Sequence, residues 1–125
     1  MIHQELIDKA KGILGKFQLS QQGLTAGSVS SALMTSKGNI YTGICLDLAC
    51  GIGFCAEHAA IAEMLKARET QIEYIVAVKS ERILMPCGRC RELMLQVSKE
   101  NLNTRVIVDN TSYVMLSELL PKHWM

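Results

Sequence analysis

Two stretches of this chain, CAEHAAI at residues 55–61 and PCGRCREL at residues 86–93, decide how the rest of the sequence is interpreted. Together they read Cys-x-Glu followed some thirty residues later by Pro-Cys-x-x-Cys. The four residues that they contribute to one site are Cys55, Glu57, Cys87 and Cys90. Three thiolates can hold one zinc ion, and a glutamate beside the first can move protons next to that ion. A Cys-x-x-Cys pair alone would be weak evidence, but the combination is specific.

Each half of this motif is predicted to open a helix, which bears on the charge of the site. Cys87 and Cys90 are three residues apart and would lie on one face of a first turn, and Pro86 suits the position just before it. Cys55 would begin the other helix. The positive ends of two helix dipoles then offset the negative charge that three thiolates place around a divalent ion.

The number of protein ligands indicates a catalytic metal site. Three ligands leave the fourth tetrahedral position of zinc open, whereas structural zinc sites use four. Glu57 is two residues from Cys55, so its carboxylate can reach the open position without binding the metal. Hydrolytic removal of an amino group needs a carrier that moves protons to the ring and to the leaving amine, and one carboxylate can do both.

Periodic patterns along the rest of the chain alternate between helix and strand. Helices are predicted over 6–17, from Cys55 onward, over 87–99, and over 118–120 after a Ser117 cap. Strands are predicted at 28–35, 40–45, 72–79, 105–109 and 113–115, with connectors at 21–27, 47–54 and 80–86. Strands separated by helices need crossovers, which favours a mixed sheet with helices packed on it in one domain, residues 1–125.

Composition describes an ordinary globular domain. At 125 residues the chain can bury its own core, and 49% of its residues are hydrophobic. The net charge is +1 and no block of Lys or Arg stands out, so the composition does not indicate a basic surface for binding a nucleic-acid polymer. No apolar run approaches the roughly 20 residues that a membrane span needs. The charged amino terminus and the odd count of five cysteines favour a cytoplasmic protein without a disulfide framework.

Other interpretations of individual residues stay open at this level. A Cys-x-x-Cys pair also occurs in redox proteins, although usually without an upstream Cys-x-Glu. His58 could complete a four-ligand structural zinc site by residue type, but it follows Glu57 directly and we expect it on a different helical face. Cys90 taken alone would be a core residue, because it falls on an apolar stripe. Cys45 and Cys50 are expected to be small buried or half-buried residues.

The chain resembles the cytidine deaminase family, and within it the small enzymes related to blasticidin-S deaminase. The similarity runs from about residue 28 to residue 124. Beside the two metal-motif segments, it is carried by SVSSAL at 28–33, IYTG at 40–43, IVAV at 75–78, and ELLP followed by Trp124. The resemblance implies an α/β fold: a three-layer α/β/α sandwich around a five-stranded mixed sheet, with one zinc ion per subunit and a homotetrameric assembly.

The same resemblance assigns roles to individual residues. It implies that Cys55, Cys87 and Cys90 bind Zn²⁺ and that Glu57 is the catalytic proton carrier. The substrate contacts that it implies are the backbone around Ala56, the carbonyl of Met85, and Trp124 as an aromatic wall of the pocket.

The chain departs from the family where the substrate's ring and sugar are bound. Relatives present Gly-x-Asn-x-Glu after the second strand, and Cys45 and Asp47 occupy the Asn and Glu positions here. The arginine that often follows Cys-Ala-Glu is His58. These departures leave the zinc chemistry intact but speak against ordinary cytidine as the substrate, because a thiol is a poor hydrogen-bonding partner.

The function predicted from the sequence is a zinc-dependent hydrolytic deaminase that acts on the 4-amino group of cytidine or a related cytosine nucleoside. One alternative is a deaminase of a modified cytosine compound, such as a nucleoside antibiotic like blasticidin S. Another is a catalytically silent zinc-binding protein of the same fold. The expected partner is therefore a small molecule, with no nucleic-acid polymer and no membrane.

Overall fold

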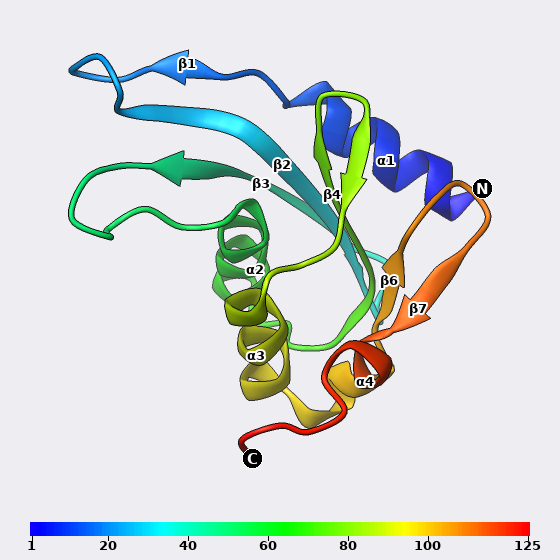
Figure 1. Ribbon diagram of the computed structural model, residues 1–125. Coiled ribbons are helices and arrows are strands. Elements are labelled where there is room, and N and C mark those ends of the chain that lie inside the picture. Colours follow the sequence, from blue (N-terminus) through cyan, green and yellow to red (C-terminus); the bar gives the residue numbers. More distant parts are fainter.

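The computed structural model describes residues 1–125 and shows a mixed β-sheet with helices on both of its faces (Figure 1). The helices are α1 (Ile2–Gly12), α2 (Ala56–Lys66), α3 (Gly88–Val97) and α4 (Leu116–Leu119), with a short 3₁₀ helix, η1, at Lys99–Asn103. The strands are β1 (Phe17–Gln18), β2 (Thr25–Thr35), β3 (Ile40–Asp47), β4 (Ile72–Lys79), β5 (Arg82–Leu84), β6 (Arg105–Ile107) and β7 (Tyr113–Met115).

The five main strands of the sheet lie side by side in the order β3-β2-β4-β6-β7. Strands β4 and β6 pair in parallel, and the other neighbours pair antiparallel. The other two strands are short additions: β1 pairs with the start of β2, and β5 pairs with the end of β4. The predicted three-layer sandwich with a mixed sheet is confirmed, and its five predicted strands are the five main strands of a seven-stranded sheet.

Consecutive residues of the central strand β4 supply the cores on the two faces of the sheet. Ile75 packs with Ile61 and Met94 beneath α2 and α3. Its neighbour Val76 points the other way and packs with Leu6 beneath α1. Side chains of a strand alternate between faces, so an almost continuous apolar strand is what a sheet covered on both faces requires.

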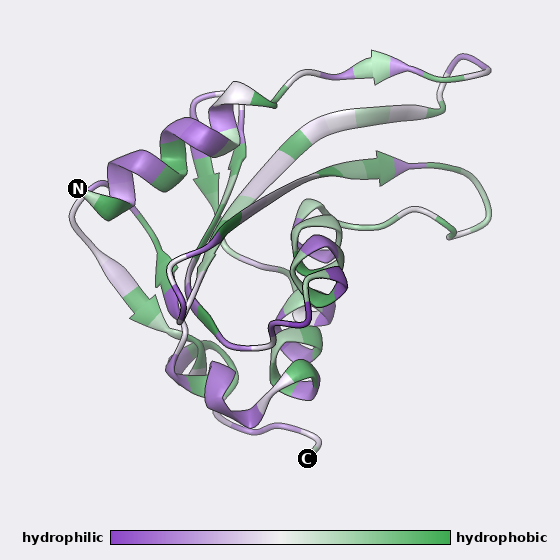
Figure 2. Cartoon of the chain, turned by 180° about the vertical axis from the view of Figure 1, so that it is seen from behind, coloured by the Kyte–Doolittle hydropathy of each residue, from purple (hydrophilic) through white to green (hydrophobic).

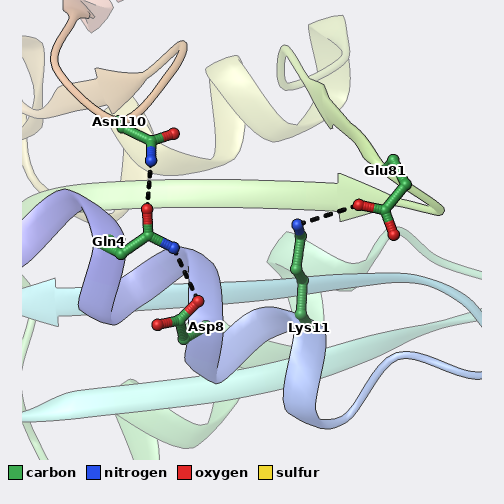
Figure 3. Close-up of polar contacts among 5 residues, drawn as sticks. All are labelled: Gln4, Asp8, Lys11, Glu81 and Asn110. Atoms are coloured by element: carbon green, nitrogen blue, oxygen red, sulfur yellow. Dashed lines mark hydrogen bonds and ion pairs between the residues drawn. The ribbon is translucent and has the colours of Figure 1, made fainter.

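Helix α1 covers one face alone, and polar contacts fix both of its ends. Figure 2 shows mixed hydrophilic and hydrophobic turns along it, and Leu6 on its inner side is fully buried. Near its start, Gln4 accepts a hydrogen bond from Asn110 in the β6–β7 turn (Figure 3). Near its end, the Nζ of Lys11 lies 3.4 Å from a carboxylate oxygen of Glu81 in the β4–β5 turn (Figure 3). Helix α1 therefore contacts the two turns that follow the neighbouring parallel strands β4 and β6.

The structure corrects several predicted boundaries in the amino-terminal third. Helix α1 ends at Gly12, and Phe17 lies in strand β1 instead of on the helix. The connector predicted at 21–27 is shorter, because β2 already begins at Thr25. Gly27 within that strand has a φ of +87°, which favours glycine and accompanies an irregular register between β2 and β3.

Further corrections concern the second half of the chain. The connector predicted at 80–86 contains the short strand β5, and helix α3 ends at Val97, two residues early. The last helix begins at Leu116 without a Ser117 cap. Instead, the carboxylate of Glu118 accepts a hydrogen bond of 2.9 Å from the backbone N–H of Met115. None of the helices combines the length and the apolar character that crossing a bilayer requires.

Candidate active site

Three of the five cysteines meet at the amino termini of two helices. Cys55 is the residue before α2, Cys87 is the residue before α3, and both have extended backbone that turns the chain into its helix. Cys90 lies in the first turn of α3. The Sγ of Cys87 lies 3.5 Å from that of Cys55 and 3.6 Å from that of Cys90. The structure thus brings together the three residues predicted as metal ligands, and both metal-motif segments open helices as predicted.

The spacing of these sulfurs fits one zinc ion. Zn–S bonds of about 2.3 Å in tetrahedral geometry separate two sulfurs by about 3.8 Å, close to the two separations observed. Burial raises the pKa of the Cys55 thiol and raises that of Cys90 far more strongly, so neither ionises readily without nearby positive charge. A divalent cation supplies that charge, and three close thiols whose ionisation needs compensation are a donor set suited to it.

The third thiol, Cys87, has the opposite tendency. Burial works to raise its pKa, but hydrogen bonds from the backbone amides of Cys90 and Arg89, with contacts to the other two thiols, leave the pKa below its ordinary value. These amides belong to the first turn of α3, whose N–H groups have no partner inside the helix. The helix amino terminus therefore stabilises the Cys87 thiolate, as the motif predicted.

His58 lies closer to the thiols than the sequence analysis expected. Its Nδ1 is 3.5 Å from the Sγ of Cys90, and the ligand atoms of Cys55, His58 and Cys90 all lie within 4.8 Å of one another. The expectation of a different helical face is wrong, because Cys55 precedes α2 and a residue three positions later returns to the same side. Burial, followed by the charge of Arg89, lowers the pKa of His58 and favours its neutral ring.

Glu57 is buried, with 5% of its surface exposed, yet its side chain lines a pocket. Burial raises the pKa of its carboxyl; a backbone hydrogen bond and the neighbouring Cys90 thiol oppose that shift without cancelling it. A carboxyl whose pKa moves toward neutrality can both hold and release a proton at the operating pH.

The pocket has a volume of about 550 Å³, which suits a small-molecule ligand. Its inner end is formed by the start of α2 and by the residue before α3, and its outer wall comes from β2, β3 and the segment after β5. The predicted site residues that line it are Cys45, Asp47, Cys55, Ala56, Glu57, Met85 and Cys87. Cys90 is fully buried behind this surface.

Solved structures share the overall fold of this chain, although no protein-family model matches it. The cytidine deaminase of Mycobacterium tuberculosis superposes with a TM-score of 0.79 at 22% identity, over 98% of this chain and 96% of that one. The cytidine deaminase of Burkholderia pseudomallei gives 0.77 at 25% identity, over 99% and 100%. The chain has the cytidine deaminase fold. The cytidine deaminase of Bacillus anthracis agrees, with a TM-score of 0.76 at 23% identity over 99% and 90%.

Within this cytidine deaminase fold, two of the three residues that depart from the family pattern, Cys45 and Asp47, form one hydrogen-bonded group with Ser28. The hydroxyl of Ser28 lies 3.2 Å from the Sγ of Cys45 and 3.2 Å from a carboxylate oxygen of Asp47. The backbone N–H of Val29 donates to the same sulfur over 3.3 Å. Ser28 opens the SVSSAL segment but was not among the predicted site residues, because a serine in a strand has no sequence signature of its own.

Two predicted positions lie apart from the pocket. Trp124 is 82% exposed near the carboxyl terminus and does not line the pocket of its own chain. Its role as an aromatic wall of the pocket therefore stays a prediction. Cys50 is exposed in the β3–α2 loop, which corrects the expectation of a buried or half-buried thiol, whereas Cys45 is buried as expected.

Proposed function

We propose that this protein is a zinc-dependent hydrolytic deaminase that removes the 4-amino group of cytidine or a related cytosine nucleoside. One observation carries the proposal: the buried carboxyl of Glu57 lines the same pocket as two thiols of a cluster whose spacing fits zinc. The cytidine deaminases that share the fold support the choice of reaction.

In the proposed reaction, Cys55, Cys87 and Cys90 would hold Zn²⁺ at the inner end of the pocket. When bound, the ion supplies Lewis acidity there. Glu57 takes one proton from the attacking water through its carboxylate and delivers it to the ring nitrogen beside the amino-bearing carbon. It then moves the second proton of that water to the amino nitrogen, which leaves as ammonia. Water and the cytosine compound thus give ammonia and the corresponding uracil compound.

Backbone groups would orient the ring for this transfer. Ala56 is the first residue of α2, so its N–H has no partner inside the helix, and the residue lines the same pocket as Glu57. Met85 also lines the pocket, and its carbonyl oxygen accepts none of the chain's hydrogen bonds, so it is free for a ligand. A backbone donor and a backbone acceptor in one pocket suit the polar edge of a cytosine ring.

The substrate preference is part of the proposal. Asp47 is shorter than the glutamate of relatives, and its carboxylate already accepts the hydroxyl of Ser28. Cys45 offers a weak partner where relatives place an amide. We therefore expect plain cytidine to be a poorer substrate than a modified cytosine nucleoside, and the blasticidin-S deaminase branch is the nearest precedent in the sequence pattern.

The test is ammonia release from a panel of cytosine compounds by the zinc-loaded protein. The panel contains cytosine, cytidine, deoxycytidine and blasticidin S, and the Glu57→Gln variant serves as the control. We expect release from at least one nucleoside, and none above background from the variant. Absence of release from every compound, with zinc bound at one ion per chain, would overturn the proposal.

A second candidate function is a catalytically silent zinc protein, and His58 is the observation that favours it. With its Nδ1 3.5 Å from the Sγ of Cys90, the imidazole could take the fourth coordination position and close the site. Cobalt substitution separates the two candidates, because the visible spectrum of Co²⁺ differs between three thiolates and three thiolates with an imidazole. Under the deaminase proposal, His58→Gln leaves that spectrum essentially unchanged.

Assembly and location are proposed with the function. A homotetramer is supported by large apolar side chains on the surface, among them Ile52 at 67% exposed and Trp124 at 82%. A cytoplasmic setting is supported by five cysteines that form no disulfide. Light scattering of the purified protein tests the first, and Trp124→Ala tests whether that side chain belongs to the contact.

A further inference from the structure

A second hollow adjoins the pocket, and no cysteine lines it. This hollow has a volume of about 570 Å³ and shares three lining residues with the pocket: Ser28, Asp47 and Lys79. Its other walls come from the α1–β1 connection, the start of β2 and the β4–β5 turn. The residues that the two hollows share lie at the strand side of the pocket, so a ligand whose base lies beside Glu57 would turn its far end toward this second hollow.

A plain nucleoside has no need of the extra space. The pocket alone, at about 550 Å³, falls inside the range of about 300–1,000 Å³ that holds a complete small ligand. The second hollow lies farther from Glu57, beyond the group formed by Ser28, Cys45 and Asp47. A group placed there would belong to the part of the substrate that does not react.

The charges of the second hollow indicate what that group is. Lys16 and Lys79 both line it, and neither takes part in any of the chain's ion pairs. Asp47 is the single acidic residue of its lining, and its carboxylate accepts the Ser28 hydroxyl at 3.2 Å. Two lysines without partners leave the hollow with a positive balance, which suits an anionic group.

The backbone beneath Lys16 holds it in place. The N–H of Gly15 donates to the carbonyl of Gly27 over 3.0 Å, which ties the connection after α1 to strand β2. Gly27 has a φ of +87°, and a Cβ there would collide with the carbonyl oxygen of Gly15. Lys16 therefore projects from a segment whose path is set by close backbone contact.

We propose that the substrate is a cytosine nucleoside whose sugar carries an anionic group, a carboxylate or a phosphate, and that Lys16 and Lys79 bind this group in the second hollow. The proposal rests on the proposed function and names the substrate class of the same site. It also accounts for Asp47: a shorter carboxylate at the junction leaves room for a sugar substituent to pass, where a longer side chain would reach across it.

The experiment compares three nucleosides: cytidine, cytidine 5′-monophosphate and cytidine 5′-carboxylic acid. Their kcat/KM values are measured with the zinc-loaded wild type and with Lys16→Gln, Lys79→Gln and the double variant. Lys99→Gln, which changes an exposed lysine on η1 away from both hollows, is the matched control. Each set is repeated at two salt concentrations, because attraction between exposed charges weakens with salt.

We expect at least one anionic nucleoside to exceed cytidine in kcat/KM. Each lysine variant should lower the ratio of anionic to neutral substrate about tenfold, the change expected for losing one charge-assisted hydrogen bond. In the Lys99→Gln variant, the ratio of kcat/KM for anionic over neutral substrate should equal that of the wild type. If only cytidine 5′-monophosphate is preferred over cytidine, the substrate class is a nucleotide. If only cytidine 5′-carboxylic acid is preferred, the substrate class is a nucleoside with a carboxylate on its sugar. The proposal is overturned if cytidine matches both anions, or if the lysine variants leave the ratio unchanged.

A binding measurement separates failure of this inference from failure of the proposed function. Isothermal titration of the zinc-loaded protein with the same three compounds needs no turnover. Tighter binding of an anionic nucleoside than of cytidine, weakened in the double lysine variant, supports the second hollow even if no ammonia is released. Equal binding of all three compounds overturns it even if cytidine is deaminated.

Discussion

A Cβ on Gly43 would lie 2.5 Å from the Cβ of Ala59, so strand β3 and helix α2 approach more closely than any side chain at position 43 allows. Gly43→Ala should push α2 away from the sheet and disturb Cys55 and Glu57 at its start. We expect a loss of about 1–3 kcal/mol in the free energy of unfolding, the usual cost of overpacking, together with weaker zinc retention. Denaturant unfolding and metal analysis measure the two effects.

Gly12→Ala is the matched control for that change. A Cβ at Gly12 meets nothing within 4 Å, and the residue is helical. Alanine there should raise the free energy of unfolding by about 0.5–1 kcal/mol, because glycine is a weak helix former. If Gly43→Ala proves as stable as the wild type, the close approach does not hold α2 in place.

Glu57→Gln removes the proton carrier while keeping nearly the same shape. We expect kcat to fall by about 10²–10⁴-fold, the range that general acid–base catalysis contributes, with zinc content and unfolding midpoint unchanged. Activity within tenfold of the wild type would remove Glu57 from the mechanism. The comparison requires equal zinc loading, checked by elemental analysis.

Cys87→Ala should abolish tight zinc binding, because it removes the thiol that lies within 3.6 Å of both other sulfurs. The control is Cys50→Ala, which changes an exposed thiol outside the cluster and should retain about one zinc per chain. Equal zinc content in the two variants would show that the ligand assignment is wrong.

Glu69 should make stability depend on acid. Hydrogen bonds, first from Thr35 and then from Tyr41, lower the pKa of its carboxyl. A carboxyl whose pKa is lower in the folded state stabilises the fold above its unfolded pKa, about 4.3, and loses that contribution as the pH falls through the folded value. Glu69→Gln should therefore be less stable than the wild type near pH 7, and the gap should narrow as the pH falls below the unfolded pKa and close once the pH is below the folded pKa. A gap independent of pH would contradict this assignment.

The double change Cys45→Asn and Asp47→Glu should raise kcat/KM for cytidine. It restores an amide and a longer carboxylate at the positions that relatives use for ring and sugar, and an unpaired polar group in a pocket costs about 1–3 kcal/mol. The N–H of Val29, which now donates to the Cys45 sulfur, could donate to the new amide oxygen. If the wild type already has a kcat/KM for cytidine of about 10⁵ M⁻¹s⁻¹ or above, the idea that cytidine is a poor substrate is wrong.

Much of this architecture could be predicted from periodicity and the two cysteine motifs. The five main strands and the helices that follow Cys55 and Pro86 could be predicted because the spacing of apolar residues differs between strand and helix. Phe17 misled the prediction because it stands four residues after Ile13 at helical spacing, while α1 has already ended at Gly12. Local spacing cannot report where tertiary packing stops a helix.

The parts of the site that escaped prediction depend on contacts between distant segments. Ser28 meets Asp47 only because β2 and β3 pair, and Lys16 and Lys79 line one hollow only because the α1–β1 connection lies beside the end of β4. His58 was expected on a different helical face, whereas its position three residues after Cys55 returns it to the side of the thiols. Its proximity to Cys90 follows once α2 and α3 are brought together.

The groups that would perform the reaction and those that would choose the substrate stand on different parts of the chain. The thiols and Glu57 belong to the starts of α2 and α3, whereas Ser28, Cys45, Asp47 and Lys79 belong to strands β2, β3 and β4. Exchanges on those strands can retune which molecule enters without altering how it is transformed. A scaffold divided in this way is open to redesign, since new specificities can be selected at the strand positions while the helix ends are kept constant.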